Sequence, residues 1–205
     1  TRPEEVDEFI DILETAAEWL MANNIKQWPP GMFRNPTARA SMLTGIANKQ
    51  YYTIDYHYPN NNGESKGTTT KTDIAGLFVT NFDDPFDELL WKEYLTEQGG
   101  DWKDALYLHR LVLKAPYKGV GLTPKIVEFV EGKVKESRRH YLRLDCLANN
   151  ERLRRFYGEK CRGAGKGGLN QLSTVWNPDL GLEFARFELQ VVPFKSSPFF
   201  VTTTD

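Results

Sequence analysis

Residues 105–113 are the segment that most constrains the fold of this chain. Their sequence, Ala-Leu-Tyr-Leu-His-Arg-Leu-Val-Leu, is almost continuously apolar, which predicts a strand buried on both faces of a sheet. Residues 122–135 follow with apolar side chains at helical spacing, and residues 140–146 predict another strand. A strand, a helix and a second strand make a crossover connection, so we expect the two strands to be parallel.

The remaining segments predict a mixed α/β domain. The other expected elements are helices at Pro3–Met21, Pro36–Ala47 and Asn150–Tyr157, a short helix within 83–100, and strands at Tyr51–Tyr58, Asp73–Thr80 and Leu182–Val192. The polar stretch Pro59–Thr72 predicts a long hairpin loop. We therefore expect one domain over residues 1–192, with a mostly antiparallel sheet and flanking helices. The tail, residues 193–205, has strand composition and is expected to add a further strand.

Composition limits the classes of function. The formal net charge is -2, so no global electrostatic attraction favours nucleic acid or an anionic membrane. Two cysteines, Cys146 and Cys161, are too few for a disulfide framework and suit a reducing compartment. The sequence contains neither a signal-peptide pattern nor an apolar run of about 20 residues. We therefore expect a cytoplasmic protein without nucleic-acid or membrane partners.

The loop before the helix at 122–135 carries the main chemical signal. Gly119 and Gly121 permit a tight turn whose amides point outward, and the helix start adds partial positive charge. This predicts a cradle for an anion such as a pyrophosphate, and a simple turn is the alternative. A second glycine-rich stretch, 162–168, fails as a P-loop because Lys160 replaces the first required glycine. The three histidines lack metal-ligand spacing, so no metal site is expected.

The glycine loop and two downstream segments together resemble the GNAT (Gcn5-related N-acetyltransferase) family. After the helix come Leu-Arg-Leu-Asp-Cys at 142–146, then Asn150 and, seven residues later, Tyr157. The order is similar to the family's strand, glycine loop, helix, strand, asparagine and tyrosine. Two departures stand out. Pro116 occupies a position where the family usually has Arg or Gln, and Thr123-Pro124 replaces a small residue and an amide-bearing neighbour.

The resemblance implies acetyl-CoA as co-substrate and a splayed pair of parallel strands that admits its pantetheine arm. Backbone amides of the glycine loop would hold the pyrophosphate, and the strand near Leu111 would pair with the arm. Asn150 would bond the cofactor, although an ordinary helix cap is the alternative for this residue. The full set of implied cofactor-binding residues is Leu111, Leu113, Lys118, Gly119, Val120, Gly121, Leu122, Thr123 and Asn150.

Two side chains are the catalytic candidates. Tyr157 matches the family's tyrosine that protonates the departing sulfur, and its reference pKa of about 10 keeps it protonated at neutral pH. His109 resembles a strand histidine that some members use as a general base, and its pKa range suits that task. The backbone amide near Leu111 would stabilise the oxyanion. A packed helix-end tyrosine and a structural core histidine are the alternatives.

The segment around Gln27 and Trp28, with Phe33, occupies the region that covers the acceptor pocket in this family. Its aromatic side chains suit an apolar or cationic amine, and a loop packed on the core is the alternative. The expected activity is acetyl transfer to the primary amine of a small molecule by a monomer or homodimer. Acetylation of a protein or peptide, and a non-catalytic acyl-CoA-binding domain, remain the alternatives.

Overall fold

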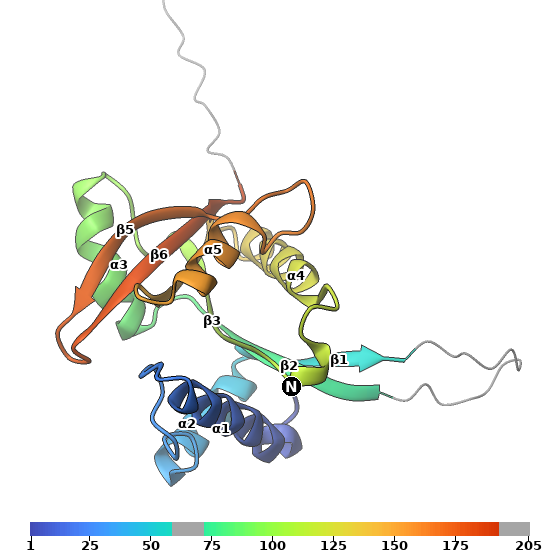
Figure 1. Cartoon of the computed structure of the whole chain (residues 1–205). Helices are drawn as coiled ribbons and strands as arrows, with labels where there is room; N and C mark the ends of the chain where they lie inside the picture. Colours follow the sequence, from blue (N-terminus) through green and yellow to red (C-terminus); the bar gives the residue numbers. More distant parts are fainter. Residues whose placement is uncertain (59–71, 193–205) are drawn as a thin grey trace, which may run out of the picture.

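A computed structural model describes residues 1–58 and 72–192, which form a six-stranded sheet with helices on both faces (Figure 1). The strands are β1 (Tyr51–His57), β2 (Thr72–Asn81), β3 (Ala105–Leu113), β4 (Tyr141–Leu147), β5 (Asn170–Asn177) and β6 (Leu182–Gln190). Their order across the sheet is β1-β2-β3-β4-β6-β5. The neighbours are antiparallel except β3 and β4, which are parallel, as the crossover predicted.

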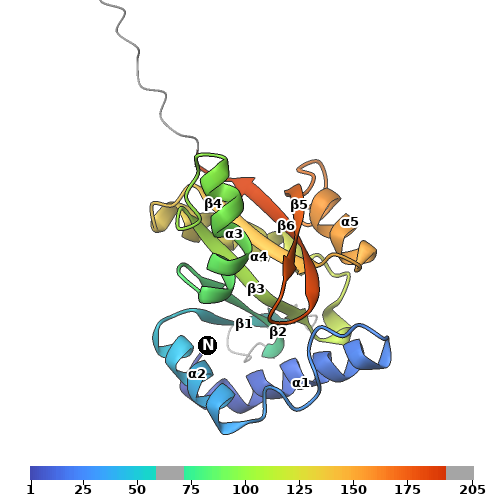
Figure 2. The ribbon, with the colours of Figure 1, turned by 90° about the vertical axis from the view of Figure 1, so that its left-hand side faces the viewer.

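Five α-helices and two short 3-10 helices complete the described fold. They are η1 (Pro3–Glu5), α1 (Val6–Ala22), α2 (Pro36–Ala47), α3 (Pro85–Glu97), η2 (Ala115–Tyr117), α4 (Leu122–Glu136) and α5 (Glu151–Glu159). Side chains of α4 and α5 pack on one face of the sheet, whereas α1, α2 and α3 pack on the other. Figure 2 shows α1 and α2 lying together beneath the strands, with α3 beside β3. Among the described residues, no helix has the length and apolar character needed to span a bilayer.

The expected fold class is confirmed, with two differences in the elements. Residues 170–177 form β5, an edge strand that the sequence reasoning missed because its residues are mostly polar and exposed. The short helix expected within 83–100 is the 13-residue α3, started by Asp84, whose side chain accepts from the Phe86 amide. The expected loop 59–72 lies outside the described residues apart from Thr72, which begins β2. The tail 193–205 also lies outside them.

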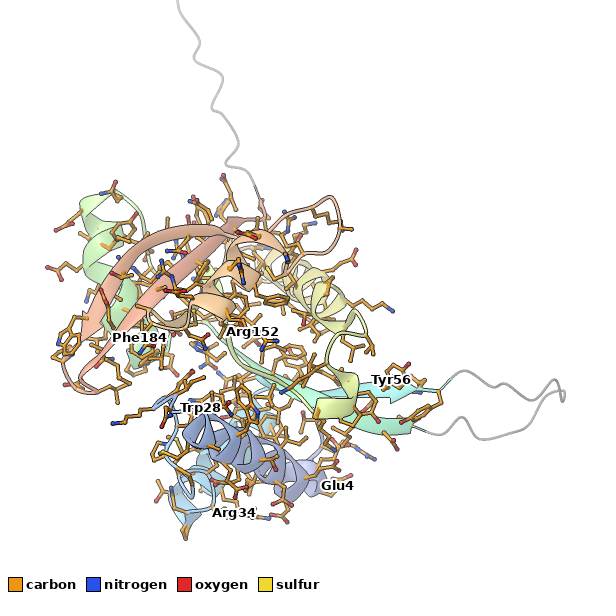
Figure 3. All side chains as sticks on the ribbon, in the orientation of Figure 1. Glu4, Trp28, Arg34, Tyr56, Arg152 and Phe184 are labelled. Atoms are coloured by element: carbon orange, nitrogen blue, oxygen red, sulfur yellow. The ribbon has the colours of Figure 1, made fainter. Side chains whose placement is uncertain are left out.

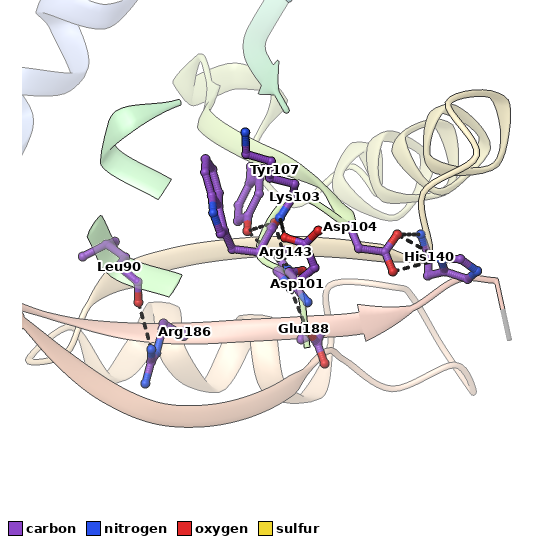
Figure 4. A network of polar contacts seen from close by, with 10 residues as sticks. Leu90, Asp101, Lys103, Asp104, Tyr107, His140, Arg143, Arg186 and Glu188 are labelled. Atoms are coloured by element: carbon purple, nitrogen blue, oxygen red, sulfur yellow. Dashed lines mark hydrogen bonds and ion pairs between the residues drawn. The ribbon is translucent and has the colours of Figure 1, made fainter. Parts of the chain in front are cut away.

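A buried arginine fixes the point where β3 and β4 meet. The Arg143 side chain is almost fully buried, and its Nε donates to a carboxylate oxygen of Glu188 at 2.7 Å. Its Nη1 donates to the carbonyl oxygens of Asp101 and Trp102, just before β3 (Figure 4). Pairing and additional hydrogen bonds are what a buried charge requires. The network therefore holds β4, β6 and the start of β3 in one arrangement.

Candidate active site

The parallel pair separates in the middle of the sheet. β3 and β4 pair only from Ala105 and Tyr141 to Tyr107 and Arg143, although both strands continue beyond these residues. The separation coincides with a bulge in β3, where Arg110 has a φ of 50° and the register with β2 shifts. Beyond Tyr107, β3 therefore has an edge that can pair with an extended ligand.

A cavity of about 1640 Å³ opens at this separation. Its walls come from α1 and the following loop on one side, from β3 and β4 in the middle, and from α5 and the β5–β6 turn on the other. In Figure 3, Trp28 marks one rim, and Arg152 and Phe184 mark the opposite rim. The volume exceeds that of an ordinary ligand pocket of about 300–1,000 Å³. The cavity is large enough for an extended cofactor together with an acceptor.

Most of the residues singled out from the sequence lie along this cavity. Those that line it are Gln27, Trp28, His109, Leu111, Leu113, Lys118, Asn150 and Tyr157. Residues 119–123 do not line it but follow Lys118 directly in the chain. Phe33 does not line it either, because it is buried in the core with its ring 5.4 Å from that of Trp28. In this structure Phe33 supports Trp28 from behind.

The glycine loop has the backbone that an anion cradle requires. Gly119 and Gly121 have φ values of 82° and 80°, and Gly121 is the residue that precedes the first turn of α4. A Cβ at either position would meet no heavy atom within 4 Å, so the space in front of both is open. The first amides of a helix lack intrahelical acceptors and favour anions. Pro124 in this turn has no amide hydrogen, so the cradle has one donor fewer.

Asn150 both caps α5 and faces the cavity. Its Oδ1 accepts from the Leu153 amide at 3.1 Å, which is the helix cap that the sequence offered as an alternative. Within the described part of the chain, its Nδ2 donates no hydrogen bond. The side chain can therefore cap the helix with its oxygen and still offer a donor to a ligand.

Tyr157 lies on α5 at the cavity wall. The residue is 8% exposed and its ring packs against Phe156 and Phe187. Burial raises the pKa of its phenol above the usual value, with smaller contributions from nearby acidic groups that include Asp145. The phenol is therefore protonated throughout the physiological pH range. A protonated side chain at the cavity wall meets the requirement for a general acid.

His109 belongs to a cluster with two carboxyl groups. Its Nε2 lies 2.9 Å from Oδ2 of Asp87, a fully buried residue on α3, and Asp145 of β4 completes the cluster. One donor atom from each of the three lies within 4.8 Å of the others. Burial acts to lower the pKa of His109, but the charge and hydrogen bond of Asp87 outweigh it and raise the pKa. The direct hydrogen bond allows His109 and Asp87 to share a proton.

A buried carboxylate holds the loop that forms the acceptor side. Glu14 of α1 is 1% exposed, and its two oxygens accept from the backbone amides of Gly31 and Phe33, each at 2.6 Å. Hydrogen bonds from backbone amides to an ionised carboxylate are among the strong ones in proteins. Glu14 therefore fixes the loop that places Trp28 against the cavity.

We expect Glu14→Gln to destabilise the protein by about 1.5–3 kcal/mol, because the amide replaces one acceptor with a donor that faces a backbone N–H. Urea unfolding followed by circular dichroism measures the change. Glu18→Gln on the same helix is the matched control, because Glu18 is exposed, and its unfolding midpoint should stay at the wild-type value. An equal midpoint for Glu14→Gln would show that these bonds contribute little.

Four further residues at the site were not singled out from the sequence. Asp87, Asp145 and Arg110 gather around His109 and the bulge, and Trp19 of α1 lies under the Lys118 ammonium at 5.0 Å from the ring centre. Each belongs to an element whose local pattern predicts only a helix or a strand. Their grouping depends on tertiary packing. The one signal in the sequence was Asp145, a charged residue in a strand whose other residues, apart from Arg143, are apolar or aromatic.

Comparison with known proteins supports the assignment of the fold. No family model matches the chain. The chain is 24% identical over 157 residues to the uncharacterized N-acetyltransferase YesJ of Bacillus subtilis (strain 168), which covers 75% of this chain and 74% of that protein. A GNAT-family acetyltransferase from Listeria monocytogenes has a similar structure, with a TM-score of 0.60, 19% identity and coverage of 93% and 91% of the two chains.

A second similar structure is an acetyltransferase from Salmonella typhimurium that was solved with its cofactor acetyl-CoA. It has a TM-score of 0.53 and 11% identity, and the match covers 96% of this chain and 94% of that one. The N-acetyltransferase of Staphylococcus aureus Mu50 matches with a TM-score of 0.54 at 15% identity, over 94% and 96% of the two chains. These likenesses confirm the fold that the sequence motifs predicted.

Proposed function

We propose that this chain, which has the GNAT acetyltransferase fold, is an acetyl-CoA-dependent N-acetyltransferase that acts on the primary amine of a small molecule. The observation that carries the proposal is the arrangement of three features at one cavity. The open edge of β3 and the protonated phenol of Tyr157 line it, and the glycine loop before α4 follows directly on the lining residue Lys118. The similar structure with acetyl-CoA bound supports the choice of co-substrate.

The residues present fit the co-substrate. The open space in front of Gly119 and Gly121, together with the Lys118 ammonium, suits a pyrophosphate. Beyond Tyr107, β3 offers backbone groups near Leu111 and Leu113 to an amide-containing arm, and Asn150 offers its Nδ2. When bound, the co-substrate supplies a thioester whose carbonyl carbon can be attacked by an amine.

Different groups of this chain would perform the separate steps of acyl transfer. The bulge at Arg110 interrupts the regular pairing of β3 beside the lining residue Leu111, and a backbone amide near Leu111 would donate to an oxyanion. Tyr157 holds the proton that a departing thiolate needs. The cluster around His109 offers a base for the attacking amine. These roles require that the cavity admit both reactants at once, and its volume allows this.

The aromatic residues that line the cavity favour a small amine over a polypeptide as the acceptor. Trp28 lines the cavity from one rim, and Phe86 and Phe184 line it from the other side (Figure 3). The rings of Phe86 and Phe184 are in edge-to-face contact at 5.4 Å. Aromatic walls of this kind bind a flat apolar body. These walls therefore suit a compact apolar group attached to an amine.

A thiol-release assay tests the proposal. The purified chain and acetyl-CoA are mixed with a panel of small primary amines and with peptides that have a free N-terminus, and liberated CoA is followed with an aromatic disulfide reagent. Cys146 and Cys161 are buried and should contribute little background. We expect amine-dependent release with small amines. Release of CoA only with peptides would show that the acceptor is a polypeptide. No release of CoA with any acceptor would contradict enzymatic transfer.

A further inference from the structure

Asp145 is an unpaired carboxyl group in the middle of the cavity. It lies on β4 just beyond the last residue pair with β3, and it lines the cavity next to His109. Within residues 1–58 and 72–192 its carboxyl group makes no hydrogen bond and no ion pair. Burial raises its pKa to about 7, an effect that the nearby His109 only partly offsets. The Asp145 side chain is half-buried, so leaving its carboxyl group without a partner has a cost that a ligand could offset.

The surroundings of Asp145 favour a cation. The charged groups that act on it are His109 of β3 and Asp87 of α3, and Asp84 at the start of α3 also acts on His109. Tyr157 of α5 approaches from the opposite wall, where it is neutral. Three carboxyl groups therefore face one imidazole. The other oxygen of Asp87, Oδ1, is buried without a hydrogen-bond partner in the described structure. Arg143 also acts on Asp87, and Arg110 and Arg152 line the same cavity, but among the described residues none of these guanidinium groups forms an ion pair with Asp145.

The Nε2 nitrogen of His109 is not available to hydrogen-bond Asp145, because it already contacts Asp87. The distance from this nitrogen to Oδ2 of Asp87 is 2.9 Å. The imidazole is thus held by α3, and Asp145 remains open to the cavity. The aromatic rings of Trp28, Phe86 and Phe184 line the same cavity. A ligand that matches this arrangement has a positively charged donor at one end and an apolar body behind it.

We propose that Asp145 is a catalytic residue that binds the acceptor as an ammonium ion and takes the first proton from it. The proposal rests on the proposed acetyltransferase function and names the acceptor class. The acceptor is a primary amine that is protonated in solution and carries a flat apolar or aromatic group next to the amine carbon.

The protons balance with the groups on the cavity wall. The ammonium gives one proton to the Asp145 carboxylate, which leaves a neutral amine with a free electron pair. That pair forms the bond to the thioester carbonyl carbon while the carbon–sulfur bond breaks. The nitrogen then gives a second proton to the imidazole of His109, and the thiolate takes one from Tyr157. One net proton passes to solvent as Asp145, His109 and Tyr157 return to their starting states.

Asp145→Asn is the main test, because asparagine keeps the shape of the side chain and removes its charge. With the amine that best supports thiol release, we expect kcat/KM to fall by about 100-fold or more, while acetyl-CoA affinity stays within about twofold. Asp104→Asn is the matched control, since Asp104 pairs with His140 away from the cavity, and it should keep wild-type kcat/KM. An unchanged kcat/KM in Asp145→Asn overturns the proposal.

A binding measurement separates this proposal from the activity on which it rests. The carboxyl carbon of Asp145 is followed by NMR in wild-type protein labelled at aspartate, with Asp145→Asn to assign the signal. Phenethylamine, an aromatic ammonium probe, should lower the pKa of this carboxyl group, and uncharged 2-phenylethanol should not. Probe binding should weaken as the pH falls through about 7, because the carboxylate becomes protonated.

If phenethylamine leaves the titration of Asp145 unchanged at millimolar concentration, ammonium recognition by Asp145 is wrong even when thiol release occurs. If the probe shifts the titration but no acceptor is acetylated, the site binds ammonium ions and the proposed transferase activity is the part that fails. The two measurements therefore decide the two claims independently.

Discussion

Tyr157→Phe should lower turnover by about 100- to 10,000-fold while leaving the affinity for acetyl-CoA nearly unchanged. The phenol is protonated and lies on the cavity wall among apolar rings. Its proton is needed only when the thiolate departs, so its removal affects the transition state and not the bound ground state. Steady-state thiol release gives kcat, and calorimetric titration gives the dissociation constant of acetyl-CoA.

Tyr56→Phe is the matched control for this substitution. Tyr56 lies in β1, near the end farthest from the cavity (Figure 3), and does not line the cavity. It should keep wild-type turnover. Full turnover in a folded Tyr157→Phe protein would show that water or another group protonates the sulfur. A parallel loss of acetyl-CoA affinity would instead assign Tyr157 to binding.

Gly119→Asp should weaken acetyl-CoA binding by about 100-fold, which corresponds to about 2.7 kcal/mol. The new carboxylate would enter the open space in front of the glycine loop, where the pyrophosphate is proposed to lie. Two unit charges about 4 Å apart repel by about 4 kcal/mol at an effective dielectric constant of about 20, and exposure of the loop reduces this value. Calorimetric titration with acetyl-CoA measures the change.

A substitution at a second glycine, Gly165, serves as the control for the effect of backbone strain alone. Gly165 has a φ of 78° and equally open surroundings, and it does not line the cavity. Gly165→Asp therefore introduces the same side chain at the same kind of backbone position. It should bind acetyl-CoA with wild-type affinity. Equal affinities in the two variants would place the pyrophosphate elsewhere.

The central crossover could be predicted from the sequence because its signals are local. The apolar run of β3, the two glycines and the helical spacing of α4 each identify an element without reference to the rest of the chain. β5 could not be predicted in this way. It is an edge strand with mostly exposed residues, so its pairing with β6 determines its conformation more than its own composition does.

The candidate site shows the same division between local and tertiary signals. Asn150 and Tyr157 were found because their order and spacing, with Tyr157 seven positions after Asn150, resemble the GNAT pattern. His109 was found because it resembles a strand histidine that some members of that family use. Asp87 was not found, because an acidic residue in the first turn of a helix has an ordinary local explanation. Its contact with His109 arises only when α3 packs beside β3.

Glu14 departs from the usual pattern of an amphipathic helix. An acidic residue in an amphipathic helix is expected to face solvent, yet Glu14 is buried and binds two amides of the loop. The same burial draws Phe33 into the core, whereas Trp28 stays at the cavity. Which of two nearby aromatic residues faces a ligand depends on such contacts and not on their type.

Calorimetric titration of the wild-type chain with acetyl-CoA tests the central claim most directly, because every proposed role depends on the thioester reaching the separation between β3 and β4. We expect saturable binding of one acetyl-CoA per chain at concentrations below about 1 mM, with binding weakened in Gly119→Asp. No binding at millimolar acetyl-CoA, in a chain shown to be folded by circular dichroism, would rule out acetyl-CoA as the co-substrate.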